Sequence, residues 1–247
     1  LTLHDGNRIV KINHSIGSGR KDIHSEPDIF SFKKIDGNTG LLRIPDFQSS
    51  TVTEMFDNAY DDILKTDALI IDIRGNGGGN SGYADHIARY FSSDSIASDS
   101  WRSPIYIPAF ASWGRDRSWY EYPSRLTPPV EDNEPYLKPV VILIDRGTFS
   151  AAEDFAALFK GMNRAVFVGT PTGGSTGNGV RVQLNSLVSA NICSKHDTAP
   201  DGSEFVGIGI QPDIIVTESP DSYFSNTDLD SYILTALKSL RDLTAHK

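Results

Sequence analysis

The chain has 247 residues, a formal net charge of -9 and a sequence pI near 5.1, and its length allows one large domain or two small ones. The acidic balance argues against a nucleic acid or an anionic membrane surface as partner. No apolar run approaches the roughly 20 residues needed to span a bilayer. The single cysteine, Cys193, excludes an internal disulfide and a cysteine-based zinc site. Because no two histidines are spaced three or four residues apart, we also expect no metal and no other cofactor.

Residues 1–39 have the alternation and the turn residues that are typical of β-structure. Residues 1–16 are expected to form a hairpin around Asp5-Gly6-Asn7. Two further strands are expected at 29–34 and 40–44.

A helix is predicted before the first fully apolar run of the chain. Thr51-Val-Thr-Glu54 has the pattern of a capping box, which marks a helix start. Met55, Tyr60, Ile63 and Leu64 would form the buried stripe of this helix.

The middle of the chain repeats a buried strand followed by a turn. Continuous apolar runs at 68–73, 140–144 and 165–168 are typical of strands that are covered on both faces. Helices are expected after the first two runs, at 81–91 and 150–161. This recurrence predicts an α/β fold with a largely parallel central sheet.

Residues 92–138 are rich in serine, proline and aromatic side chains, and they hold all three tryptophans. Such a stretch with little periodicity is typical of a lid, an insertion or a contact surface, although the aromatic residues could equally pack onto the domain. Within it, Ile105-Tyr-Ile107 could form a short strand. The elements expected after the middle units are strands at 180–184, 187–193, 204–208 and 212–216 and a helix at 228–243.

Ser150 lies where the apolar run at 140–144 passes through a sharp turn into the next predicted helix. Such a turn exposes the hydroxyl, and the first amides of the helix attract negative charge, which suits a nucleophile. Ser150-Ala-Ala-Glu153 is also the pattern of a capping box, in which Ser150 would only cap the helix. The residues alone leave both interpretations open.

A glycine-rich turn, Gly75-Asn-Gly-Gly-Gly79, follows the run at 68–73. Its backbone amides could converge on an oxyanion or a phosphate, or the turn could simply be a tight connection. Neither this turn nor the one at 169–179 ends in the Gly-Lys-Ser/Thr of a P-loop. Together with Ser150, the turn would supply the nucleophile and the amides that an acyl-transfer site needs.

Four ordered motifs resemble those of the tail-specific, or C-terminal processing, protease family, which includes the tricorn core protease and interphotoreceptor retinoid-binding protein. The match covers roughly residues 40–216. The motifs are Leu69-Ile-Ile-Asp-Ile-Arg-Gly-Asn-Gly-Gly-Gly79, Asp145-Arg-Gly-Thr-Phe-Ser-Ala-Ala-Glu153, Val168-Gly-Thr-Pro-Thr-Gly-Gly-Ser175 and Asp201-Gly-Ser-Glu-Phe-Val-Gly-Ile-Gly-Ile-Gln-Pro-Asp213.

The resemblance implies a core of the crotonase and Clp-protease type, an α/β fold of repeated strand-strand-helix units with a mainly parallel sheet and antiparallel β additions. It also implies that Ser150 is the acyl-forming nucleophile. The amide of Ala151 and a glycine amide of the pair Gly77 and Gly78 would form the oxyanion hole, with Gly78 favoured. Glu153 would support the site or cap the helix.

Two departures from the family concern the general base. The processing proteases use a lysine in the third motif, and the matching residue here is Ser175. The tricorn-like branch uses an upstream histidine and a downstream glutamate, but the usual glutamate position holds Val206, with Glu204 two residues earlier. Lys195 and His196 are the substitutes that lie nearest to the motifs.

We therefore expect a serine endopeptidase that cleaves unfolded or C-terminal peptide segments through an acyl-enzyme on Ser150. Residues 1–39 would be the tail of an absent upstream PDZ-like module, and residues 40–247 the catalytic core with an insertion at 92–138. The chain would then be a fragment without its general base. The family also implies export to a bacterial periplasm or cell surface.

The alternative is a non-catalytic module that binds a peptide or an apolar ligand on the same fold. The missing lysine and the aromatic insertion favour this alternative.

Overall fold

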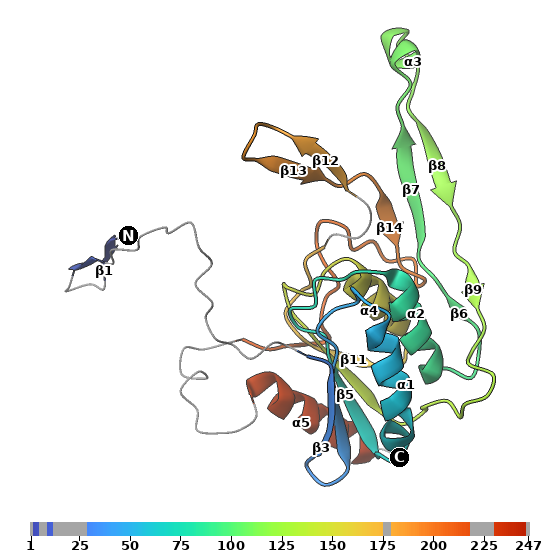
Figure 1. Cartoon of the computed structure of the whole chain (residues 1–247), viewed down its shortest axis with the longest axis vertical. Helices are drawn as coiled ribbons and strands as arrows, with labels where there is room; N and C mark the ends of the chain where they lie inside the picture. The colour runs from blue at the N-terminus through green and yellow to red at the C-terminus, as the bar shows by residue number, and fades with distance from the viewer. Residues whose placement is uncertain (1, 5–8, 12–28, 175–178, 218–229, 246–247) are drawn as a thin grey trace.

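A six-stranded sheet forms the centre of the computed structural model, which describes residues 2–4, 9–11, 29–174, 179–217 and 230–245. The strand order is β15-β11-β10-β5-β4-β3 (Figure 1). All neighbouring pairs are parallel except β3 and β4, which confirms the predicted α/β class. The strands are β3 (Ser31–Ile35), β4 (Thr39–Arg43), β5 (Ala68–Asp72), β10 (Val140–Ile144), β11 (Val166–Gly169) and β15 (Ile214–Ile215).

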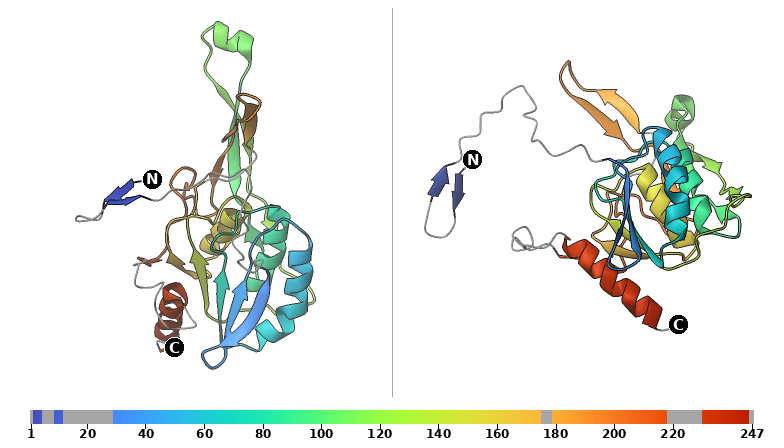
Figure 2. Two further views of the ribbon diagram at one scale, coloured as in Figure 1. Left: turned by 60° about the vertical axis from the view of Figure 1, so that its left-hand side comes forward. Right: turned by 60° about the horizontal axis from the view of Figure 1, so that its bottom comes forward.

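Helices cover both faces of this sheet (Figure 2). One face carries α1 (Thr51–Leu64), α2 (Ser81–Ala88), the 3-10 helix η1 (Arg89–Phe91) and α4 (Ala151–Gly161), and the other carries α5 (Ser231–Ala245). The central strand β10 serves both cores, with Ile142 and Ile144 in the first and Val141 and Leu143 in the second. Burial on both faces explains why this strand is apolar at every position.

The start of α1 differs from the prediction. The cap position is Ser50 and no side chain caps the helix there, so the predicted capping box at Thr51 is wrong. The buried stripe includes Val52 and Phe56, whereas Met55 is exposed. The shift arises because several consecutive residues before the helix are capable caps, and the sequence pattern does not choose among them.

The predicted insertion forms a long antiparallel arm that projects from the body of the domain (Figure 1). Of the short strand expected at 105–107, only Ile105 lies in a strand, the last residue of β7. A strand at 196–198, which the sequence pattern does not predict, pairs along the arm. The elements are β6 (Ile96–Ala97), β7 (Ser100–Ile105), α3 (Pro108–Ser112), β8 (Ser118–Tyr122), β9 (Leu126–Thr127) and β14 (His196–Thr198).

Two antiparallel hairpins agree with their predictions. The described residues of the N-terminal hairpin pair as β1 (Thr2–His4) and β2 (Ile9–Lys11), whereas its predicted turn, Asp5-Gly6-Asn7, lies outside the described residues. Further along the chain, β12 (Val180–Gln183) pairs with β13 (Ser189–Ile192). The strand predicted at 204–208 is absent, and only an isolated bridge joins Glu204 to Thr198.

The predicted domain boundary at residues 39 and 40 lies within the antiparallel pair of β3 and β4. The division between residues 39 and 40 falls inside this hairpin, so residues 31–35 belong to the core sheet. Among the described helices, none combines the length and the apolar character that crossing a bilayer would require.

Candidate active site

The turns that follow β5 and β10 lie against each other at the carboxyl ends of these parallel strands. The amide of Gly75 donates to Oδ1 of Asp145 (2.8 Å), and the amide of Phe149 donates to the carbonyl of Asn76 (2.9 Å). Thr148 Oγ1 also donates to the carbonyl of Ile73 (3.0 Å). Crevices outside the carboxyl ends of parallel strands are the usual place for ligand sites in α/β sheets.

Ser150 stands at the cap position of α4 with a backbone conformation that is rare for serine. Its φ is 57° and its ψ is -126°, a combination that non-glycine residues hold only at a cost of about 1–3 kcal/mol. The side chain is half-buried. A strained serine between a strand and a helix is how nucleophiles are commonly presented in α/β hydrolases.

Gly78 packs directly onto this serine turn. A Cβ at Gly78 would lie 2.7 Å from Ser150 Cβ and 2.8 Å from the Ala151 amide nitrogen, and the backbone has φ of 90°. Only glycine therefore fits, because a side chain at this position would collide with the serine turn. The two turns that the sequence paired as nucleophile and oxyanion donors are thus adjacent.

The backbone amides near Ser150 differ in whether they already donate a hydrogen bond. In the described part of the chain, the amides of Gly77, Gly79 and Ala151 donate to no acceptor. The amide of Gly78, the favoured donor, already donates to Oδ1 of Asn76 (2.9 Å). It can reach a reacting oxygen only by giving up that hydrogen bond.

Glu153 is fully buried one turn into α4 and accepts hydrogen bonds from three directions. Oε2 accepts from the amide of Ser150 (3.1 Å), and Oε1 accepts from Thr172 Oγ1 (2.6 Å) and from the amide of Gly174 (2.7 Å). The carboxylate thus ties the serine turn to the turn after β11. It caps the helix and supports the site at once, and its contact with Ser150 is to the backbone.

Thr172 extends this network to the fourth sequence motif. Its Oγ1 accepts from the amide of Ile210 (2.7 Å), and its own amide donates to the carbonyl of Ile210 (3.2 Å). The amide of Gly207 donates to the carbonyl of Gly174 (2.6 Å). All four motifs therefore meet around the start of α4.

The residues that the sequence suggests as general bases are engaged with other partners. Lys195 Nζ forms an ion pair with Asp197 Oδ1 (2.5 Å), and His196 Nε2 lies 3.8 Å from Glu204 Oε2. Among the described residues, none of Lys195, His196 and Glu204 hydrogen-bonds to Ser150. Ser175 lies outside the described residues.

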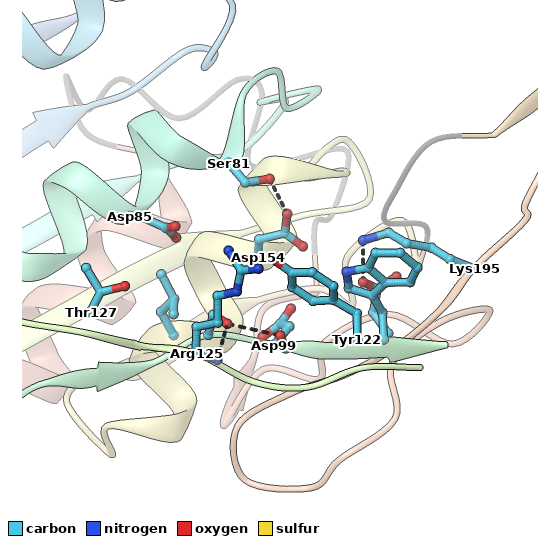
Figure 3. Close-up of a pocket in the computed structure, with 12 residues that line it drawn as sticks. Ser81, Asp85, Asp99, Tyr122, Arg125, Thr127, Asp154 and Lys195 are labelled. Atoms are coloured by element: carbon cyan, nitrogen blue, oxygen red, sulfur yellow. Dashed lines mark hydrogen bonds and ion pairs between the residues drawn. The ribbon is translucent and has the colours of Figure 1, made fainter. Parts of the chain in front are cut away.

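A cavity of about 360 Å³ opens beside α4 between α2 and the base of the arm (Figure 3). Asp154 and Leu158 of α4 line it, and they follow Ser150 at intervals of four residues on the same side of the helix. The remaining lining residues are Ser81, Asp85, Ser98, Asp99, Trp101, Tyr122, Arg125, Thr127, Lys195 and Asp197.

The environment of this cavity disfavours the ionised form of its carboxyl groups. Burial, together with the nearby carboxylates of Asp154 and Asp197, raises the pKa of Asp99 to about 9. Burial also raises the pKa of Asp154 to about 6, although a hydrogen bond from Ser81 (2.5 Å) opposes the shift. Burial raises the pKa of Asp85 as well.

Sequence reasoning did not single out Asn76 or the carboxylates of the cavity. Asn76 is fully buried and bridges the carbonyl of Ile44 and the amide of Gly78 through its side chain, a role that its place within the first motif could have indicated. The cavity residues come from five separate stretches of the sequence, and no local pattern connects them.

The strain at Ser150 can be measured by comparing two substitutions. Ser150→Gly should be more stable than Ser150→Ala by about 1–3 kcal/mol in urea unfolding, because glycine adopts positive φ without strain. Ser50, the cap of α1 with φ of -57°, is the matched control. Its glycine and alanine variants should differ by less than about 1 kcal/mol, since only capping preference separates them. Equal stability of the two Ser150 variants would contradict a strained turn.

Glu153→Gln should lower the free energy of unfolding by about 2–4 kcal/mol, because the new amide group places a donor against buried donors. Urea unfolding monitored by circular dichroism gives this value. Glu54→Gln, on the exposed side of α1, should change stability by less than about 0.5 kcal/mol. If Glu153→Gln and Glu54→Gln were equally stable, the hydrogen bonds of Glu153 would not be what stabilises the serine turn and the turn after β11.

Asp99 should make the protein less stable as the pH rises. Its pKa is about 9 when folded and 3.8 ordinarily, so between these values the folded state binds more protons than the unfolded state, and stability falls with rising pH. Asp99→Asn removes this contribution. The advantage of the variant over the wild type should grow between pH 5 and pH 8 by about 1.4 kcal/mol per unit at most, measured by urea unfolding at each pH. The exposed Asp132→Asn is the control, and a difference independent of pH would refute the assignment.

The sequence matches the family model described as Peptidase family S41 over residues 38–216. It is 27% identical over 214 residues to a carboxy-terminal-processing protease of Bartonella bacilliformis, and this alignment covers 82% of this chain and 45% of that protein. The chain spans less than half the length of the curated relatives that it matches.

Solved structures share the fold. A candidate peptidase from Parabacteroides merdae superposes with a TM-score of 0.71 at 21% identity, covering 85% of this chain and 64% of that chain. The photosystem II D1 C-terminal processing protease gives a TM-score of 0.51 at 23% identity, covering 76% of this chain and 47% of that chain. Because the family model extends from β4 to β15 and so takes in well over half of the sequence, the chain belongs to the serine peptidase family S41.

Proposed function

We propose that this domain hydrolyses peptide bonds through an acyl-enzyme on Ser150, and that unfolded or C-terminal protein segments are its substrates. The observation that carries the proposal is the contact of Gly78 with the Ser150 turn, which sets the serine beside the backbone of the glycine turn. Family membership supports the same reaction class. An exported location, which the resemblance implies, stays a prediction.

In this reaction Ser150 Oγ attacks the carbonyl carbon of the scissile bond, and the oxygen of that carbonyl gains negative charge. The amide of Ala151 and one amide of the pair Gly77 and Gly78 donate to that oxygen, and these hydrogen bonds strengthen as charge develops. Glu153 holds the Ser150 amide and acts as a positioning residue. A general base takes the proton of the Ser150 hydroxyl and passes it to the leaving amine as the carbon–nitrogen bond breaks. Water, which gives a proton to the same base, then attacks the acyl carbon, and the bond to Oγ breaks as Ser150 regains its proton.

We propose that the general base comes from outside this chain, from residues upstream of it. Support comes from the engagement of Lys195 with Asp197 and from the family lysine position being Ser175. A serine without a base is a poor nucleophile at neutral pH. The isolated chain should therefore be weakly active or inactive, and a form extended upstream should be active.

The cavity beside α4 does not suit the apolar ligand of the binding-module alternative. An apolar ligand needs a mostly apolar pocket, whereas the cavity beside α4 carries four carboxyl groups and two cationic side chains. The proposal of a peptidase is therefore the better supported of the two.

A fluorophosphonate serine probe tests the proposal on this chain and on an upstream-extended form. We expect the extended form to be labelled at Ser150, found by mass spectrometry of the digested adduct, at a rate at least about tenfold above that of this chain, because general-base assistance is worth at least that much. Ser150→Ala should abolish labelling, and the exposed Ser203→Ala should not. Absence of labelling in both forms would overturn the proposal.

A further inference from the structure

The cavity beside α4 contains buried carboxyl oxygens to which no described residue donates a hydrogen bond. Both carboxylate oxygens of Asp99 and Oδ1 of Asp154 are buried and, among the described residues, have no hydrogen-bond partner. Burying an ionisable group without a partner is costly. An arrangement kept at such a cost indicates a site that is completed by a ligand.

The charges around the cavity define that ligand as a cation. Four carboxyl groups and two cationic side chains line the cavity, which leaves a formal excess of two negative charges when all four carboxyl groups are ionised, the state that a bound cation favours. Lys195 is already paired with Asp197. Arg125 lies over the ring of Tyr122, 4.5 Å from its centroid, and forms no ion pair with the described residues. Figure 3 shows the carboxyl groups of Asp99 and Asp154 facing the space around Arg125.

The walls fit the aliphatic stem of an organic cation. Trp101 and Tyr122 are stacked with ring centroids 5.0 Å apart and planes 13° apart, and Leu158 adds an apolar contact on the helix side. Long cationic side chains bury their methylene groups along such surfaces. A metal ion is a poorer fit, because no three described acidic, histidine or cysteine side chains converge as ligands.

The position of the cavity relates it to Ser150. Asp154 and Leu158 lie one and two turns beyond Ser150 on one side of α4. Asp154 is also joined to Ser81 at the start of α2, which follows the glycine turn directly. A peptide held at Ser150 could therefore place a neighbouring side chain in the cavity.

We propose that this cavity is a substrate subsite that binds the cationic end of a lysine or arginine side chain of the peptide. The ammonium or guanidinium group would lie between Asp99 and Asp154, and the stem would lie along Trp101 and Tyr122. This subsite rests on the proposed peptidase function, since it names the side chain that the enzyme selects.

Isothermal titration of this chain with N-acetyl-lysine amide and N-acetyl-norleucine amide tests the subsite at pH 7.5. The two probes differ in an ammonium group, and we expect the lysine probe to bind at least about tenfold more tightly, as charge-assisted hydrogen bonds allow. Asp99→Asn and Asp154→Asn should each remove that preference and leave norleucine binding unchanged. Asp61→Asn, exposed on α1, is the matched control and should keep it.

Several outcomes would overturn the subsite. They are equal binding of the two probes, no binding of either, and a lysine preference that survives both cavity variants. n-Butylamine bound as tightly as the lysine probe would assign the cavity to free amines and overturn it too. Fluorophosphonate labelling of Ser150 in the extended form does not depend on the cavity. Labelling without a lysine preference therefore removes only the subsite, whereas a lysine preference without labelling removes the peptidase role.

Discussion

The buried carboxylate of Glu153 is the interaction on which the arrangement of the site depends. It accepts from the serine turn through Ser150 and from the turn after β11 through Thr172 and Gly174. The loop at Ile210 is attached in turn through Thr172. One acceptor at the first turn of a helix thus organises segments that are far apart in the sequence. The neutral glutamine of the same shape would fit poorly, because these three partners are all donors.

The strained conformation of Ser150 follows from this organisation. A serine with positive φ persists only where its surroundings determine the backbone, and here Glu153 holds the amide while Gly78 packs on the other side. The same close approach requires glycine at position 78. Strain at the serine and the absence of a side chain in the glycine turn are therefore two parts of one geometric requirement.

The sequence predicts the framework well where burial dictates the pattern. Strand β10 is apolar at every residue because it serves two cores, and this signal is local. The strand predicted at 204–208 fails because Gly207 and Gly209 adopt positive φ and turn the chain. The pattern indicates a strand of the arm only around Ile105, because the strands of the arm are largely exposed and carry no alternation.

The candidate site can be inferred from the sequence only where a local pattern marks its residues. The serine turn and the glycine turn each carry a local pattern, and the family motifs relate these two turns to one site. The engagement of the Gly78 amide by Asn76 depends on side-chain geometry that no pattern encodes. The cavity carboxylates Asp99 and Asp154 come from different segments, and only the folded chain brings them together.

The central claim is that Ser150 and the neighbouring amides form one acyl-transfer site. A crystal structure of the upstream-extended protein with a phosphonate bound to Ser150 tests it most directly. The account predicts a phosphonyl oxygen within about 3.1 Å of the Ala151 amide and of an amide of the Gly77 and Gly78 pair. An adduct whose oxygens all point away from both amides would contradict it.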